Sequence, residues 1–140
     1  MPVDAALHRG VISMASAVKQ WRGTEVSRVG LRALLDPDAE SPGESLARVA
    51  LLRSGLAVRS QVFYEGIGRV DLQVRGVVVE IDGREYHSDP QAFERDRRRD
   101  RALRLMGLTV FRYSAREVFD DPRAVARDVR AVVAREQTSA

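Results

Sequence analysis

The stretch VDLQVRGVVVEID, residues 70–82, decides the fold of this chain. Two runs rich in β-branched residues flank Arg75 and Gly76, and two residues is the length of the shortest common β-hairpin loop. Such a loop sets the register, because Val74 must then pair with Val77 and each step outward adds one pair. The register predicts that Asp71 lies opposite Glu80.

Alternation along the two strands separates an apolar face from an acidic face. The acidic face receives Asp71, Glu80 and Asp82. Two opposed carboxylates have Cβ atoms about 5 Å apart and repel each other. A divalent cation, a shared proton or an arginine must offset this repulsion, and Arg69, placed opposite Asp82, is one candidate for a purely structural ion pair. The apolar face is predicted to hold Val70, Leu72, Val74, Val77, Val79 and Ile81.

The segments around the hairpin predict an α/β domain with the element order αβββαβα. Ser41-Pro42-Gly43-Glu44 has the pattern of a capping box and begins a helix that ends near Gly55. Residues 1–38 carry weaker helical patterns and are predicted to form a helical N-terminal extension to a domain over residues 39–136. The predicted core is a mixed four-stranded sheet flanked by helices, with strands over 58–64, 69–74, 77–82 and 109–113 and helices over 88–106 and from 121 onward.

Composition limits the kinds of site that this chain can form. Its 140 residues are 44% apolar, which fits one domain, and they include no cysteine. A thiolate zinc site is therefore excluded, and oxygen or imidazole ligands favour Mg²⁺ or Mn²⁺. No apolar run reaches membrane-spanning length and the N-terminus lacks the order of a signal peptide, so a cytoplasmic protein without a membrane partner is expected.

Charge is compatible with a nucleic-acid partner. The net charge is +3, and Lys19 is the only lysine among 23 basic residues. Arginine is suited to phosphate because its planar guanidinium donates two parallel hydrogen bonds. A GC-rich genome would produce the same arginine bias, so the composition supports nucleic-acid binding without establishing it.

Three further residues are candidates for the acidic site. His87 follows the acidic strand closely, and an imidazole near a metal can take a proton from water. Asp96 falls in the apolar arc of the predicted helix over 88–106, where its carboxylate would either orient His87 or pair with Arg95 or Arg99. Glu44 is explained by the capping box, yet the first turn of its helix can also come beside the strand carboxylates.

A set of short motifs resembles the very-short-patch-repair endonuclease-like group of the PD-(D/E)xK nuclease superfamily. The predicted αβββαβ order also agrees with the restriction-endonuclease-like core of that superfamily, and the resemblance covers about residues 41–120. The motifs are Glu44-Ser45, Arg69-Val70-Asp71, Val79-Glu80-Ile81-Asp82-Gly83, Tyr86-His87, Glu94-Arg95-Asp96-Arg97-Arg98 and Gly107-Leu108-Thr109-Val110-Phe111-Arg112.

The resemblance implies a DNA endonuclease that depends on Mg²⁺ or Mn²⁺. Asp71 would bind the ion, and Glu80 and Asp82 would complete or orient its shell. His87 would be the base or acid, supported by Asp96, and Glu44 would correspond to the acid on the family's helix. The implied nucleic-acid contacts are Arg69, Arg84, Arg95 and Arg98, although an arginine run such as 95–101 is most often a solvated helix face.

The chain departs from the superfamily at one position that matters for catalysis. The usual lysine two residues after the strand glutamate is replaced by Asp82, and the zinc ligands of the very-short-patch enzymes are missing. The alternative is therefore a catalytically inactive nuclease-fold module that binds nucleic acid or regulates, associated with a toxin–antitoxin system or a mobile element. A homodimer formed through the N-terminal helices is a third hypothesis.

Overall fold

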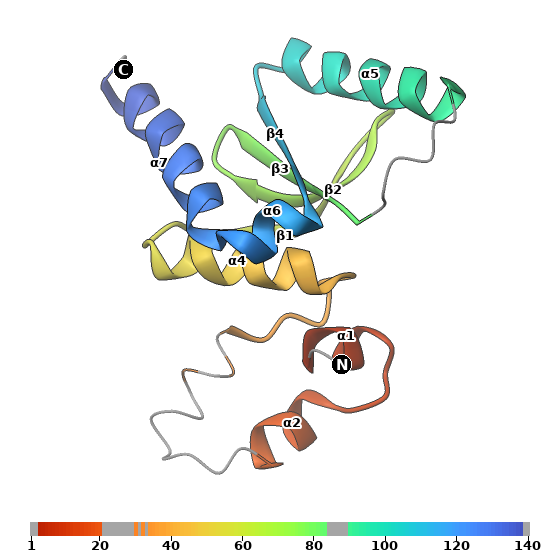
Figure 1. Cartoon of the computed structure of the whole chain (residues 1–140), viewed down its shortest axis with the longest axis vertical. Helices are drawn as coiled ribbons and strands as arrows, with labels where there is room; N and C mark the ends of the chain where they lie inside the picture. Colours follow the sequence, from red (N-terminus) through yellow and green to blue (C-terminus); the bar gives the residue numbers. More distant parts are fainter. Residues whose placement is uncertain (1–2, 21–29, 31, 33, 84–89, 139–140) are drawn as a thin grey trace.

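A mixed sheet of four strands lies between two layers of helices (Figure 1). The computed structural model describes residues 3–20, 30, 32, 34–83 and 90–138. The strands follow one another across the sheet in chain order, with β1 to β3 antiparallel and β4 parallel to β3. They are β1 (Arg59–Tyr64), β2 (Gly68–Val74), β3 (Val77–Asp82) and β4 (Thr109–Ser114). The predicted α/β class and strand order are confirmed.

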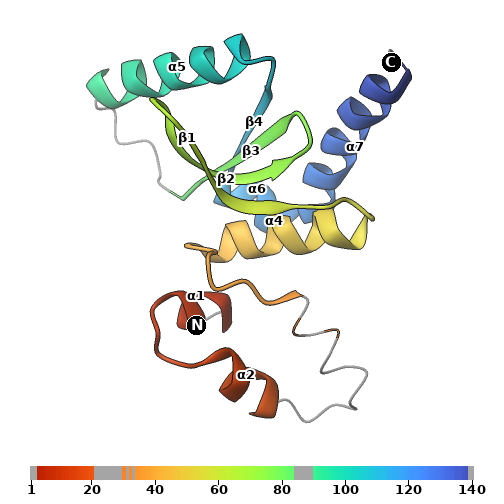
Figure 2. The same cartoon turned by 180° about the vertical axis from the view of Figure 1, so that it is seen from behind.

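Helices cover both faces of this sheet. On one face lie α4 (Pro42–Arg53), α6 (Ala115–Asp120) and α7 (Pro122–Thr138), and α5 (Pro90–Leu105) crosses the other. Helix α5 is the crossover that joins the parallel strands β3 and β4. Beyond α4, away from the sheet, lie α1 (Val3–His8) and α2 (Met14–Gln20) (Figure 2). Among the described residues, no helix combines the length and apolar character needed to cross a membrane.

The hairpin between β2 and β3 has the predicted register. Val74 pairs with Val77, and the ladder continues outward to the pair of Leu72 with Val79. Arg75 has a φ of 50°, in the left-handed region that two-residue hairpin loops require. The ladder ends at that pair, so the predicted pair of Asp71 with Glu80 is not formed, and these two acidic residues lie just beyond the last paired position.

The sheet buries apolar side chains on both faces. Toward α4, α6 and α7 lies the larger core, which includes Leu51, Leu72, Val79 and Val129. The prediction that Val70 shares this face is wrong, because Val70 packs with Val78 and Leu103 on the α5 side. Gln61 of β1 lies beside this point, between Ser60 and Val62, which pair with Leu72 and Val70. Its φ of 50° twists β1 and β2 here.

Helix α4 approaches β3 closely because its second residue is glycine. A methyl group on Gly43 would lie 2.9 Å from Ile81 Cγ2, inside normal contact distance. Glu44 is the next residue, so this close approach sets how near the first turn of α4 comes to the end of β3.

Gly43→Ala is expected to lower the free energy of unfolding by about 1–2 kcal/mol, because the added methyl group forces Ile81 and α4 apart. Urea denaturation measures the change. Ile81→Leu removes Cγ2, so the double variant should lose less stability than the sum of the two single variants. Additive losses would show that the contact does not limit the approach of α4.

Candidate active site

Asp71 and Glu80 join β2 and β3 through their side chains, just beyond the last pair of the ladder between the two strands. Asp71 Oδ2 accepts a hydrogen bond from the Ile81 backbone N–H at 2.7 Å. The Glu80 carboxylate accepts one from the backbone N–H of Asp71. Both carboxylates thus take the place of ladder carbonyls as acceptors, which holds them close together, and Glu80 is only 4% exposed.

Glu44 faces these strand carboxylates from the start of α4. Ser41 caps the helix, and its Oγ accepts from the Glu44 backbone N–H at 3.2 Å as predicted. The other half of the predicted capping box is wrong, because Glu44 Oε2 accepts from the Glu40 N–H and from Gln61 Nε2, each at 3.0 Å. The buried Glu44 side chain is turned toward β1, where its charge acts on Asp71.

We call Glu44, Asp71, Glu80 and Asp82 the carboxylate cluster. Burial raises the pKa of Asp71 to about 6, and the charges of Glu44 and Asp82 act in the same direction. Burial, followed by the charge of Asp71, raises the pKa of Glu80 to about 7. The predicted repulsion between the two strand carboxylates is therefore present.

Two arginines offset part of this charge. Arg99 of α5 places Nη2 2.9 Å from Glu80 Oε1 and also donates a hydrogen bond to the Arg69 carbonyl. Arg112 of β4 lies beside Glu80 in the parallel ladder, with Nη1 3.4 Å from Asp82 Oδ1. The sequence predicts an arginine as one possible partner of the strand carboxylates, but it does not identify Arg99 or Arg112 as that partner.

The predicted pairing of Arg69 with Asp82 is wrong. The ladder between β2 and β3 ends at Leu72 and Val79, so the register never brings these two side chains opposite each other. Arg69 is exposed, and its nearest carboxylate oxygen in an ion pair is Glu40 Oε1 at 3.9 Å.

The prediction that Asp96 faces the core is wrong. Its side chain is exposed, as are Gln91 and all residues from 93 to 98. Helix α5 contacts the sheet through its C-terminal half, where Leu103 is fully buried, and its N-terminal half extends past the sheet. Predictions for His87 and Arg84 fall on residues outside the described ranges.

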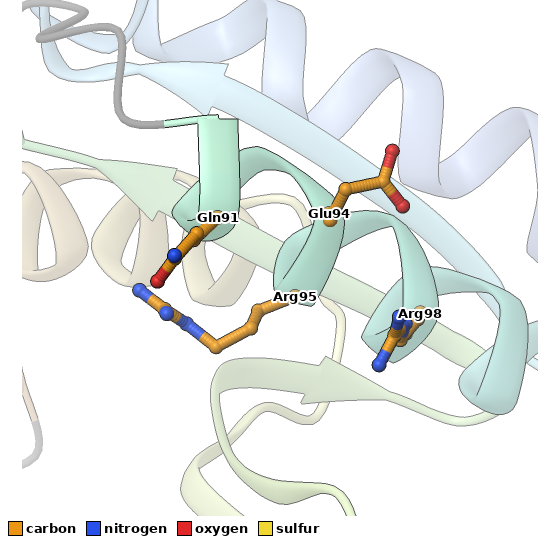
Figure 3. Close-up of a pocket in the computed structure, with 4 residues that line it drawn as sticks. All are labelled: Gln91, Glu94, Arg95 and Arg98. Atoms are coloured by element: carbon orange, nitrogen blue, oxygen red, sulfur yellow. The ribbon is translucent and has the colours of Figure 1, made fainter.

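The exposed half of α5 carries two of the predicted nucleic-acid contacts. Arg95 and Arg98 line an open hollow of about 450 Å³ together with Gln91 and Glu94. Figure 3 shows the Arg95 side chain reaching back toward Gln91, while Glu94 points to the other side of the helix. Both of these arginines therefore lie on the helix that also carries Arg99.

Comparison with known proteins places this fold and site in a family. Residues 44–133, from the helical glutamate through β4 to the last helix, match the REase_MTES_1575 family, which is of restriction-endonuclease type. This match spans most of the chain. The chain belongs to the REase_MTES_1575 family. The predicted nuclease-type domain is confirmed at this level, while the likeness to very-short-patch enzymes stays a prediction.

A solved structure shares the fold of this REase_MTES_1575 domain. It is the catalytic domain of the homing endonuclease I-Bth0305I, with a TM-score of 0.52 and 16% sequence identity. The match covers 64% of this chain and 91% of the homing endonuclease domain. No curated protein matches the chain. The restriction-endonuclease-like core that the element order predicted therefore has a structural counterpart.

Several residues of the candidate site were not predicted from the sequence. Asp100 of α5 accepts from Arg112 Nη2 at 2.8 Å and from Nε at 3.2 Å. Gln61 fixes Glu44, and Arg99 reaches Glu80 from the other layer of helices. Gln61 is distinguished only by its positive φ, and that angle is a property of the folded backbone, so the sequence does not predict it.

The carboxylate cluster is not arranged as a complete metal site. Within residues 3–20, 34–83 and 90–138, no three His, Asp or Glu side chains are grouped so that they could hold one metal ion. Asp82 is half exposed and pairs with Arg112, whose Nη1 lies 3.4 Å from its Oδ1. The metal role predicted for these three residues is therefore a matter for proposal and experiment.

The metal-free protein is expected to lose stability as pH rises from about 4 to about 8. The folded pKa values of about 6 for Asp71 and about 7 for Glu80 lie above the ordinary carboxyl values, so the folded state holds protons that the unfolded chain has released. The loss begins above the unfolded pKa values and is complete above the folded ones, and each unit by which a folded pKa exceeds its unfolded value adds about 1.4 kcal/mol to it.

Thermal unfolding in the presence of a chelator, at pH 5 and pH 8, measures this loss. In Asp71→Asn/Glu80→Gln, neither side chain ionises, so most of the difference between the two pH values should disappear. An unchanged pH dependence in that double variant would assign it to other groups.

Proposed function

We propose that this protein is a metal-dependent DNA endonuclease that hydrolyses phosphodiester bonds. The observation that carries the proposal is the pair of carboxylates just beyond the end of the ladder between β2 and β3. Asp71 and Glu80 are held by backbone N–H groups of the opposite strand, and burial, together with neighbouring carboxylates, raises the pKa of both side chains. Such a site in a domain of a restriction-endonuclease-type family supports phosphodiester chemistry.

The ligand chemistry of Asp71 and Glu80 fits a hard divalent cation. In the described part of the chain, Glu80 Oε1 is buried and has no aligned hydrogen-bond donor, although Arg99 Nη2 lies at 2.9 Å. Carboxylate oxygens are the ligands that Mg²⁺ and Mn²⁺ prefer. Asp71 and Glu80 would hold the ion, and Asp82 would join them on release from Arg112. When bound, such an ion neutralises phosphate charge and lowers the pKa of a bound water.

The protein's own contribution is orientation. Asp71 is fixed through the Ile81 N–H, and Glu44 is fixed by donors from Glu40 and Gln61, so neither carboxylate has to reorganise when substrate arrives. His87 is proposed as the residue that takes a proton from the attacking water or gives one to the leaving oxygen.

DNA would approach from the side of α5. Arg95 and Arg98 are exposed on the half of α5 that extends past the sheet, and Arg69 is exposed on β2. Guanidinium groups so placed would bind backbone phosphates, which position a duplex or single strand without reading its sequence. Arg84 is proposed to add a fourth contact.

A plasmid assay tests the proposal. Supercoiled DNA is incubated with the protein and Mn²⁺ or Mg²⁺, with a chelator control and with His87→Ala alongside. Wild-type protein should nick or linearise the plasmid only when the ion is present, and His87→Ala should be slower by about 10²-fold or more. Absence of cleavage with either ion, or cleavage that survives the chelator, would contradict the proposal.

One observation favours a second candidate, a DNA-binding module that does not cut. Asp82 stands where the superfamily has lysine, and arginines at 99 and 112 already offset Glu80 and Asp82. Such a module would bind DNA with a strong salt dependence and would not require a cation. Calorimetry with Mn²⁺ separates the two, since only the endonuclease must bind the ion.

A further inference from the structure

Arg99 reaches across the site from α5 to Glu80 of β3 and Arg69 of β2. Its Nη2 lies 2.9 Å from Glu80 Oε1, and the same guanidinium donates to the Arg69 carbonyl. The Glu80 side chain is 6% exposed, whereas the Arg99 side chain is 26% exposed. The guanidinium therefore lies between a buried carboxylate and solvent.

The contact between Arg99 and Glu80 leaves polar atoms unpaired. Within the described residues, Glu80 Oε1 and Arg99 Nε are both buried and have no hydrogen-bond partner. Charge holds the two groups together, but their geometry does not form an aligned hydrogen bond. An ion pair of this kind is readily exchanged when a better partner for each group arrives.

Arg112, the other arginine of the site, is held by several hydrogen bonds to Asp100. Its Nε lies 3.2 Å from both carboxylate oxygens of Asp100, and its Nη2 lies 2.8 Å from Oδ1. Several parallel hydrogen bonds to one carboxylate fix a guanidinium in place. Of these two arginines, Arg99 is the one whose present contacts leave it able to change partner.

Strand β3 itself supplies no cation at this point. The position two residues after Glu80 is Asp82, and the one lysine of the chain, Lys19, lies in α2 on the far side of α4 (Figure 2). The substrate is a phosphodiester, so a positive group beside the carboxylates is needed to bind a phosphate oxygen there. Arg99 reaches this position from α5.

We propose that Arg99 is the phosphate-binding cation of this site and competes with the divalent ion for Glu80. Without the ion, Arg99 pairs with Glu80. With Glu80 loaded, the guanidinium turns to a nonbridging oxygen of the scissile phosphate. This inference rests on the proposed endonuclease function. It places the positive charge of the site on α5, because β3 has an aspartate, Asp82, two residues after Glu80.

The test compares full-length wild-type protein with Arg99→Met, Arg99→Lys and the control Arg53→Met, which replaces an exposed arginine at the end of α4. Calorimetry measures Mn²⁺ binding without DNA, and single-turnover plasmid cleavage is measured at saturating Mn²⁺. Arg99→Met should bind Mn²⁺ about tenfold more tightly, because a competing charge is gone. It should cleave about 10²-fold more slowly, because the phosphate loses its cation.

Arg99→Lys keeps the charge and should cleave at a rate between those of wild type and Arg99→Met, and Arg53→Met should match wild type in both measurements. Weaker Mn²⁺ binding by Arg99→Met would overturn the proposal, since Arg99 would then only hold Glu80 in place. Unchanged cleavage by Arg99→Met would overturn it too, with the endonuclease function intact. If wild type itself does not cleave, the endonuclease function falls, and the Mn²⁺ titration still decides whether Arg99 competes for Glu80.

Discussion

Asp71→Asn is expected to lower the rate of plasmid cleavage by about 10³-fold or more, because the charge that would hold the divalent ion is removed. Asparagine has the same shape, and its side-chain oxygen can still accept the hydrogen bond that Asp71 Oδ2 accepts from Ile81 at 2.7 Å. The fold should therefore persist, and relief of the repulsion with Glu80 should leave the metal-free variant at least as stable as wild type.

Single-turnover cleavage measures the rate, thermal unfolding measures the stability, and Mn²⁺ calorimetry measures the loss of ion binding. Asp120→Asn is the matched control, because Asp120 is exposed at the end of α6 and pairs only at 3.8 Å with Arg116. That control should cleave like wild type. Cleavage by Asp71→Asn at the wild-type rate would remove Asp71 from the reaction and with it the proposed site.

Leu103→Ala is expected to lower the free energy of unfolding by about 3 kcal/mol, because it leaves a cavity in the smaller core. Leu103 is fully buried, and it is the α5 residue that packs with Val70 and Val78. The N-terminal half of α5 is exposed, so this contact largely fixes the helix on the sheet. Urea denaturation measures the loss.

The same helix offers a control with the same chemistry. Leu105 is 83% exposed, so Leu105→Ala should change the free energy of unfolding by no more than about 0.5 kcal/mol. Because α5 also carries Arg99, Leu103→Ala should in addition disturb the contact with Glu80. Equal losses of stability in the two variants would show that Leu103 does not anchor α5.

Local patterns predicted most of the fold. The two-residue loop at Arg75 and Gly76 was enough for the register of β2 and β3, since that pairing depends only on neighbouring residues. Helix ends followed from capping chemistry in the same way: Ser41 caps α4 through the Glu44 N–H, and Gly55, where that helix was predicted to end, has a positive φ. The family match over residues 44–133 agrees with the motifs that the sequence displayed in order.

Periodicity was less reliable where an element extends beyond its support. Asp96 shares an arc of the wheel with Leu103, but a wheel does not show where a helix leaves the sheet. Val70 alternates with Leu72 in sequence, but the backbone beside Asp71 twists and sends it to the other core. Both errors come from treating a local repeat as if it continued without end.

By itself, the sequence determined the hairpin register, the apolar face of β3 and the nearness of Asp71 to Glu80, because hydrogen-bond spacing and side-chain alternation are local properties. Only the tertiary structure decided which groups meet those acids. Arg99 depends on how α5 crosses the sheet, Arg112 on the parallel pairing of β4, and Gln61 on a left-handed residue in β1. The chain has many arginines of identical charge, and only packing over long sequence separations selects the two that reach the carboxylates.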